Sequence, residues 1–384
     1  MTAFFTAPRI VAGPGAIEQL SALGAHRAAL VIDPTIQRAE RHRRAVEELS
    51  KTDTTIEVFA AEPAEPTVVA VDALAQRLRA FHPEWIVAIG GGRTIDAGKA
   101  AWVRYAAPDL ALESVTPLIE LKLRASAAFV ALPTTSGSGC DAAWSAMVRA
   151  EDGRPIEVAS RELVPDWTLL DPALPASMPA ALTAETGAEL IAHAFEAAVS
   201  EWSNPFSDAL ARDALITAIG ELPKATKHPD DLEARSSLHA AATMAGIAAS
   251  NAQFGVAHAL AVALGSSNGR SYGRTIGTLL PYVAEYDYPS ARDKYAGLAG
   301  VFGAPAVRDR SGVAERLRSL WAQVGIPKTL AEAGFAAPLE GAELARVVER
   351  ARSSTSAVAN PRVPSEPELA ALLDAAYRGA PVTF

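Results

Sequence analysis

The sequence predicts an α/β domain with a mostly parallel sheet, followed by an all-α C-terminal domain. Up to about residue 176, short apolar runs of strand length alternate with helical patterns, which is typical of a parallel sheet with crossover helices. From Pro179 onward, nearly every segment instead has apolar residues at helical spacing. A chain of 384 residues is also too long for one ordinary core. We therefore expect two domains, over residues 1–176 and 177–384, with an active-site cleft between them.

The first domain is expected to contain six strands. Bulky apolar residues fill several of these runs, as in strands that are buried on both faces. The expected strands are 9–12 (which follows Phe4 and Phe5), 28–32, 55–59, 85–89, 127–132 and 167–170. Helices are expected at 17–23, at 68–81 and around Ile95.

The second domain is expected to be helical throughout. Glycine and proline residues separate its helical patterns, and the change of pattern places the domain boundary near Ser177. The expected helices are 181–199, 207–219, 232–264, 274–282, 290–301, 313–324, 341–351 and 367–377.

Three consecutive glycines stand between the run 85–89 and a helical pattern. Without a Cβ atom, Gly90, Gly91 and Gly92 allow an anion to approach the backbone N–H groups at the start of that helix. A pyrophosphate is the natural occupant, and Asp96 and Lys99 of the same helix are expected near the cofactor side. This interpretation makes the first domain a dinucleotide-binding domain. The alternative is that the glycines only make a turn.

Polar residues follow two other expected strands. Asp33 comes directly after 28–32, where a carboxylate can bind the ribose hydroxyls of adenosine and repel a 2′-phosphate, which favours NAD over NADP. Asp33-Pro34 is also an ordinary turn starter. Hydroxyl side chains and glycines fill 133–139, at the end of another strand, and ligands bind at such ends in open α/β sheets.

Composition excludes several classes of partner. The net charge is -9 and no run of Lys or Arg forms a stripe, so we expect no nucleic acid and no membrane as partner. A small-molecule or peptide substrate and a possible homodimer are expected instead. The single cysteine, Cys140, excludes an internal disulfide framework and fits a reducing cytoplasm. No signal peptide or membrane-spanning run is apparent, so a cytoplasmic location is expected.

Two of the seven histidines lie in unusual surroundings. Glu189 and His193 are four residues apart on one expected helix and project from one face. His258 lies in an otherwise apolar helix, where a buried imidazole needs a partner. A core histidine bonded to a backbone carbonyl would explain either position. Two histidines and a carboxylate can also bind a divalent metal with open positions, which makes Glu189, His193 and His258 candidate ligands.

These segments together resemble the iron-containing (group III) alcohol dehydrogenase family, related in fold to dehydroquinate synthase and glycerol dehydrogenase. The similarity is carried by Gly90 to Lys99, Pro133 to Gly139, Thr186 to Glu196, Ser203 to Asp208, Gly255 to Ala261 and Asn360 to Arg362. The resemblance implies that Gly90 to Gly92 hold the pyrophosphate of NAD and that Asp33 sets the preference for NAD. It also implies that Thr134 and Thr135 approach the nicotinamide ribose. We expect Ser138, in the same segment, to bind the cofactor as well.

The sequence departs from the family's pattern at the metal site. The family typically binds its metal through one Asp and three His. The resemblance keeps His193 and His258 but places Glu189 at the Asp position and Tyr272 at the last His position. A bound iron or zinc ion is therefore one expectation, and function without metal is another. Without a metal, a general acid or base must handle the alcohol proton, and the candidates are Tyr272, His258 and His193.

Three functions remain open at this point. The first is an NAD(H)-dependent oxidoreductase that interconverts an alcohol and an aldehyde or ketone. The second is a tailoring dehydrogenase of natural-product or modified-peptide pathways, which oxidises a β-hydroxy acid with loss of CO2. The third is a nucleotide-binding pseudoenzyme that serves as a scaffold.

Overall fold

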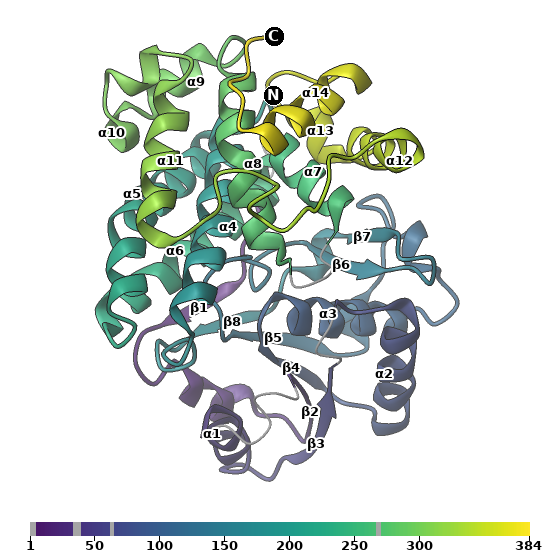
Figure 1. Cartoon of the computed structure of the whole chain (residues 1–384). Coiled ribbons are helices and arrows are strands. Elements are labelled where there is room, and N and C mark those ends of the chain that lie inside the picture. Colours follow the sequence, from purple (N-terminus) through teal and green to yellow (C-terminus); the bar gives the residue numbers. More distant parts are fainter. Residues whose placement is uncertain (1–4, 34–39, 62–64, 266–269) are drawn as a thin grey trace. The chain divides into compact units, whose positions relative to one another are not determined.

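The computed structural model describes residues 5–33, 40–61, 65–265 and 270–384. The chain divides into two compact units (Figure 1). One unit spans Thr6–Ser177, and the other spans Met178–Phe384 and includes Phe5, whose ring centroid lies 5.5 Å from that of Phe206. Phe4 and Pro34, which entered the sequence expectations, lie outside the described residues.

A six-stranded sheet forms the centre of the unit Thr6–Ser177 (Figure 1). Its strand order is β1-β8-β5-β4-β2-β3, and all of these pairings are parallel. The strands are β1 (Arg9–Ala12), β2 (Arg27–Ile32), β3 (Thr55–Ala60), β4 (Trp85–Gly90), β5 (Ala128–Pro133) and β8 (Trp167–Leu170). The predicted parallel sheet is confirmed, and each of the six expected strands is present.

Helices cover both faces of this sheet, because alternate side chains of each buried strand point to opposite faces. In β4, Ile86 and Ala88 pack with α2 (Val68–Phe81) and α3 (Gly92–Ala106), whereas Val87 and Ile89 pack with η1 (Ala16–Leu23) and α1 (Glu40–Leu49). The neighbouring strands β2 and β4 are therefore followed by helices on opposite faces. Their carboxyl ends form a topological switch point, which is where open α/β sheets bind ligands.

Three features of this unit differ from the expectation. The strands β6 (Ser145–Arg149) and β7 (Pro155–Ala159) form a separate antiparallel hairpin, which was missed because its apolar positions alternate over only five residues in each strand. The segment expected as an α-helix near residue 17 is the 3-10 helix η1. Helix α1 was also missed, because most of its residues are charged. Short 3-10 helices complete the unit: η3 (Leu112–Ser114), η4 (Leu123–Ala125) and η5 (Arg161–Leu163).

The second unit is built from helices, which confirms the predicted all-α C-terminal domain (Figure 1). Its α-helices are α4 (Ala180–Val199), α5 (Pro205–Lys227), α6 (Leu232–Ala252), α7 (Val256–Leu264), α8 (Tyr272–Asp287), α9 (Arg292–Gly297), α10 (Ala299–Phe302), α11 (Gly312–Val324), α12 (Gly341–Arg352), α13 (Thr355–Ala359) and α14 (Glu366–Arg378), with the 3-10 helix η6 (Ala306–Arg308). A large apolar cluster, to which α4, α5, α7, α8, α11 and α14 all contribute, forms its core.

The prediction of one continuous helix over 232–264 is wrong. The structure breaks it into α6 and α7, whose axes differ by 102°. The backbone of Gln253 has φ 69°, outside the helical region, and Gly255 precedes the first residue of α7. Apolar residues continue on both sides of the break, so periodicity alone did not reveal it, although Gly255 is a helix-breaking residue. The break gives α7 an N-terminus of its own, three residues before His258.

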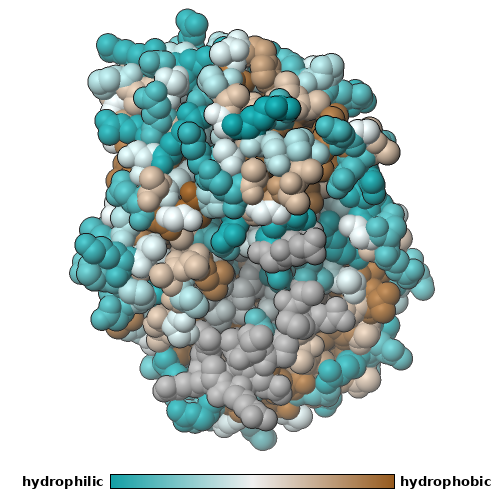
Figure 2. All heavy atoms as spheres, in the orientation of Figure 1, coloured by the Kyte–Doolittle hydropathy of each residue, from teal (hydrophilic) through white to brown (hydrophobic). Residues whose placement is uncertain are grey.

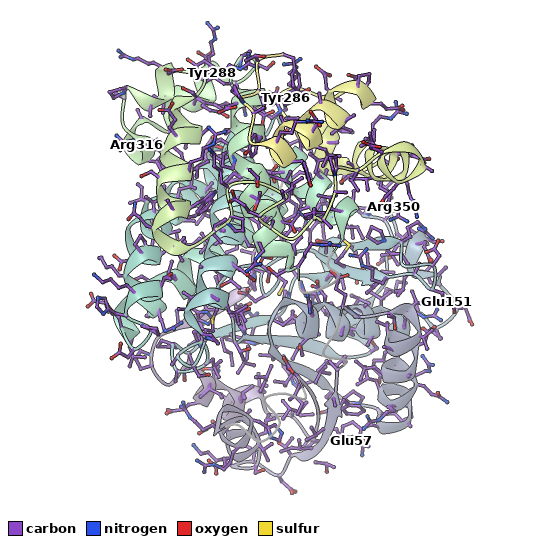
Figure 3. The ribbon with its side chains drawn as sticks, viewed as in Figure 1. Glu57, Glu151, Tyr286, Tyr288, Arg316 and Arg350 are labelled. Carbon is purple, nitrogen blue, oxygen red and sulfur yellow. The ribbon has the colours of Figure 1, made fainter. Side chains whose placement is uncertain are left out.

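Polar groups inside either unit are exceptions to a largely apolar interior. Hydrophilic side chains cover much of the face shown in Figure 2. Exposed charged residues such as Glu151 and Arg316 point outward from their own units (Figure 3).

Among the described residues, no single helix is long and apolar enough to cross a membrane. In this part of the chain, only the bent pair of helices α6 and α7, taken together, has sufficient length and apolar composition.

Candidate active site

The three glycines form the turn from β4 into α3, as the sequence predicts. Helix α3 begins at Gly92, and its N-cap residue Gly91 offers no side chain to cap the first N–H groups. A Cβ atom on Gly92 would lie 2.9 Å from the Oγ of Ser138, and one on Gly91 would lie 3.4 Å from the side chain of Thr135. The segment 133–139 therefore packs directly against the glycine turn. The structure brings both expected cofactor-binding segments together at one helix N-terminus.

Asp33 lies at the switch point of the sheet. It follows β2 directly, and its backbone N–H donates to the carbonyl of Ile89, the residue before Gly90, over 3.3 Å. Asp33 and the glycine turn thus end adjacent strands whose following helices lie on opposite faces. This is where a dinucleotide would place its adenosine ribose and its pyrophosphate.

Lys99 does not have the expected place on the cofactor side. Its side chain is fully buried, and its ammonium donates to the carbonyls of Cys140 at 2.6 Å, Ala143 at 2.5 Å and Ser145 at 3.4 Å. An ammonium has three N–H groups, so these carbonyls use all of them. Burial lowers the pKa of Lys99. Lys99 instead fastens the segment after the 133–139 loop to α3.

Asp96 has a related structural contact. Its carboxylate accepts the backbone N–H of Met147 over 3.2 Å, so Asp96 ties α3 to strand β6. Burial raises the pKa of Asp96 to about 7, against the opposing effect of the Lys99 charge. Both residues that the motif assigned to the cofactor therefore hold the protein around the glycine turn.

In the helical unit, a close crossing of α4 and α8 positions the candidate catalytic side chains. A Cβ atom on Gly273 would overlap the carbonyl oxygen of Glu185, and one on Gly277 would lie 2.8 Å from the Cβ of Ala188. These glycines allow the start of α8 to lie directly on α4. Ser271, the N-cap of α8, also donates to the carboxylate of Glu185 over 2.6 Å. Tyr272 is thereby held beside the face of α4 that carries His193.

The hydroxyl of Tyr272 lies between two imidazoles. Its Oη is 2.7 Å from Nδ1 of His258 and 3.1 Å from Nε2 of His193. His193 and His258 are 3% and 8% exposed, whereas Tyr272 is half-buried. Burial, together with the neighbouring His193, lowers the pKa of His258 well below its ordinary value, so His258 is neutral. The three predicted catalytic residues form one hydrogen-bonded group, which we call the His–Tyr–His cluster.

Two buried polar residues cap the helix that carries His258. The carboxylate of Glu196 accepts N–H bonds from Ala257 at 2.6 Å and from His258 at 3.2 Å, and the amide oxygen of Asn360 accepts the N–H of Val256 at 3.0 Å. Asn360 in turn donates to the carboxylate of Asp287 over 2.6 Å. Burial raises the pKa of Glu196 to about 7, although the backbone N–H bonds act in the opposite direction. These caps fix the position of His258 along α7.

Sequence reasoning assigned no role to Glu196 or Asn360, and it left Phe254 open between a residue that lines the substrate site and a core residue. The ring of Phe254 stacks on that of His258, with centroids 4.1 Å apart and an angle of 4° between the planes. It also contacts the ring of His193 at 4.6 Å. All three residues lie in or beside segments that carry the family resemblance, and that was the only available signal. Their contacts depend on the break between α6 and α7.

A glycine turn at the switch point of a parallel sheet and a buried imidazole–phenol cluster define an oxidoreductase of the α/β dehydrogenase class. Residues 7–172 match the family described as iron-containing alcohol dehydrogenase, and residues 183–377 match the C-terminal part of the Fe-containing alcohol dehydrogenase family. The chain belongs to the iron-containing alcohol dehydrogenase family. It is therefore an oxidoreductase that interconverts alcohols and aldehydes.

Several known proteins are similar over nearly the whole chain. The NADPH-dependent butanol dehydrogenase of Clostridium saccharobutylicum is 30% identical over 99% of both chains. The bifunctional aldehyde-alcohol dehydrogenase of Escherichia coli is 32% identical over 95% of this chain, which spans only 45% of that protein. The iron-containing alcohol dehydrogenase of Thermococcus thioreducens has 29% identity and a TM-score of 0.87 over 98% of this chain and 100% of that one. A solved 1,3-propanediol oxidoreductase has 26% identity and a TM-score of 0.89, with the same coverage.

The family is named for iron, but the residues of this chain do not fit such an ion. In the described part of the chain, no group of three or more His, Cys, Asp or Glu side chains is arranged to hold a metal, and Glu189, His193 and His258 do not form one. A metal would need the two imidazole nitrogens about 2.0–2.1 Å away. Those nitrogens, Nε2 of His193 and Nδ1 of His258, instead share the hydroxyl of Tyr272. The three-ligand site considered from the sequence is therefore not formed.

Proposed function

We propose that the chain uses NAD(H), in preference to NADP(H), to interconvert a small alcohol with its aldehyde or ketone. Asp33 at the carboxyl end of β2, beside the glycine turn of β4, is the observation that carries this preference. A carboxylate there accepts hydrogen bonds from ribose hydroxyls and repels a 2′-phosphate. The butanol dehydrogenase relative is described as NADPH-dependent, so the preference rests on this chain's own residues.

The cofactor would lie with its pyrophosphate against Gly91 and Gly92. The backbone N–H groups at the start of α3 and the hydroxyls of Thr135 and Ser138 surround that position. Thr134, in the same segment, is buried and would approach the nicotinamide ribose. When bound, NAD accepts or donates the hydride. The side chains around it bind and orient the two phosphates.

The His–Tyr–His cluster would handle the proton of the alcohol. Hydride transfer from a carbinol leaves a hydroxyl proton that a positioned acid or base must accept. Tyr272, His193 and His258 can serve as this acid or base, because the structure joins them by hydrogen bonds. We also place the protein in the cytoplasm, a reducing compartment that suits its single, buried cysteine.

Binding of NADH and NADPH, followed by nicotinamide fluorescence, tests this function. We expect wild type to prefer NADH by at least about tenfold, or about 1.4 kcal/mol. Asp33→Ser should remove most of that preference. Gly91→Val should abolish binding of both cofactors, because its side chain would fill the space where the pyrophosphate meets the backbone.

The fold has room for a Cβ atom at Gly91, so circular dichroism of Gly91→Val must match wild type before a loss of binding is assigned to the pyrophosphate site. A Cβ atom at this position makes only ordinary contact with Thr135, and the backbone of Gly91 has φ -72°, which any residue can adopt. Gly220→Ala, in a part of α5 where an added Cβ meets nothing within 4 Å, is the matched control. Equal affinity of wild type for NADH and NADPH would show that Asp33 does not set a cofactor preference. Unchanged NADH binding by Gly91→Val would show that the glycine turn does not hold the pyrophosphate.

A further inference from the structure

The His–Tyr–His cluster joins two imidazole nitrogens through one hydroxyl, and its bond lengths indicate where the protons lie. A phenol has one proton, so it donates to one nitrogen and accepts from an N–H of the other. The contact of 2.7 Å to Nδ1 of His258 has the length of a bond donated by a hydroxyl, and the contact of 3.1 Å to Nε2 of His193 has that of a bond donated by an N–H. The shorter contact favours an arrangement in which Tyr272 donates to His258 and accepts from His193, and this tautomer is the one that the NMR measurement below tests.

The phenol is also the most accessible group of the cluster. His193 and His258 are more than nine-tenths buried, and the ring of Phe254 covers one face of His258. Tyr272 is only half-buried. Of the three residues, Tyr272 is therefore the one that a substrate can contact most readily.

The cluster leaves no position for a bound cation. The phenol oxygen lies between Nδ1 of His258 and Nε2 of His193, the position in which both nitrogens could bind a cation, and in the proposed arrangement one of these nitrogens carries a proton. A metal ion needs a lone pair on each nitrogen and would have to displace the phenol oxygen. Gly273 and Gly277 let the start of α8 lie directly on α4, and this crossing places Tyr272 between the two imidazoles.

We infer that the hydroxyl of Tyr272 replaces the metal ion for which the family is named, and that it transfers the substrate proton to His258. The inference rests on the proposed oxidoreductase function. In alcohol oxidation, the carbinol hydrogen leaves with its electron pair to NAD+, which becomes NADH. The hydroxyl proton of the alcohol passes to Oη of Tyr272 as the phenol proton passes to Nδ1 of His258, and the carbonyl bond forms. The proton leaves the cluster again before the next turnover, as expected for an imidazole whose pKa is lowered, and reduction follows the reverse course.

The first test is the metal content of the purified enzyme. Wild type and Tyr272→His are produced in medium supplemented with iron and zinc, purified without chelator and subjected to elemental analysis. We expect wild type to hold far less than one metal ion per chain and Tyr272→His, which restores an imidazole, to hold more. Equal, near-stoichiometric metal in both proteins would overturn the inference. So would loss of wild-type turnover on treatment with EDTA.

The second test is the effect of removing one oxygen atom. Tyr272→Phe should lose about 10²–10⁴-fold in kcat, the contribution of a positioned proton donor. Its affinity for NADH should stay unchanged, because the glycine turn is untouched. The control is Tyr288→Phe, since Tyr288 follows the other end of α8 and is also half-buried (Figure 3). A fully active Tyr272→Phe enzyme would overturn the inference.

A third measurement separates this inference from the proposed function. Nitrogen-15 NMR of the imidazoles should show His258 with its proton on Nε2, and Tyr272→Phe should alter that signal. This result does not depend on turnover. If wild type binds NADH but no alcohol or aldehyde is converted, the proposed function fails while the metal content and the NMR signal still test the cluster. A proton on Nδ1 of His258 would contradict the inference even in an active enzyme.

Discussion

Replacing Glu196 with Gln should change how the stability of the helical unit depends on pH. Glu196 is 1% exposed, and burial raises its pKa from 4.5 to about 7 in the folded protein. Its neutral form is thus favoured by folding, so its contribution is fully present below pH 4.5 and is lost as the pH rises through about 7. At about 1.4 kcal/mol for each pH unit, the loss amounts to about 3 kcal/mol. Gln does not titrate, so the advantage of wild type over the variant should shrink by that amount.

Thermal unfolding of the full chain, followed by circular dichroism from about pH 5 to about pH 8, measures this difference. For a unit of about 200 residues, a change of about 3 kcal/mol corresponds to about 6–12 °C in Tm. Asp287, whose pKa is raised mainly by burial and further by the charge of Glu196, is present in both proteins, so only the part of its effect that depends on Glu196 remains in the comparison. The control is Glu349→Gln, an exposed change on α12 that should follow wild type at every pH. A constant difference in Tm between Glu196→Gln and wild type over this range would refute the reasoning.

Two further substitutions test how the sites are held. Lys99→Met leaves the carbonyls that its ammonium binds without a donor and should destabilise the sheet unit by about 2–4 kcal/mol, which urea unfolding would detect. An unchanged unfolding midpoint would show that these bonds contribute nothing net. Gly273→Ala should push α8 from α4 and lower both turnover and Tm, at a cost of about 1–3 kcal/mol, whereas Gly220→Ala should not. Full activity of Gly273→Ala would show that the close crossing is not needed to place Tyr272.

The fold was predictable where burial on both faces leaves only apolar residues. The run that became β4 and its neighbours β2 and β5 are continuous apolar segments, so their strand character and parallel pairing could be predicted. The hairpin of β6 and β7 was not predictable, because its apolar residues alternate over too few positions. The break at Gln253 was also missed, because apolar residues continue on both sides of the few non-helical residues, Gln253 to Gly255, that produce it.

The residues of the candidate site could be predicted from the sequence, but the contacts between them could not. Glycine spacing and strand ends indicated which residues face a cofactor. Lys99, which follows the three glycines, is instead buried and donates to backbone carbonyls. The three members of the His–Tyr–His cluster come from α4, α7 and α8, and their meeting depends on how these helices cross. Such a crossing is fixed by close approach at Gly273, which a sequence pattern does not show. The resemblance to a family therefore identified the candidate residues, whereas the packing of the helices in this chain determines their hydrogen-bond partners.

The capping of α7 also bears on which substrates the helical unit can accept. The first N–H groups of a helix, with its positive dipole end, commonly attract phosphates and carboxylates. Beside His258, the N–H groups of Val256 and Ala257 are already bonded to Asn360 and to the carboxylate of Glu196. An acidic substrate would meet a helix end whose first N–H groups are already bonded by the protein itself. An uncharged alcohol or aldehyde loses nothing there, whereas a hydroxy acid would need a cationic anchor from another part of the chain.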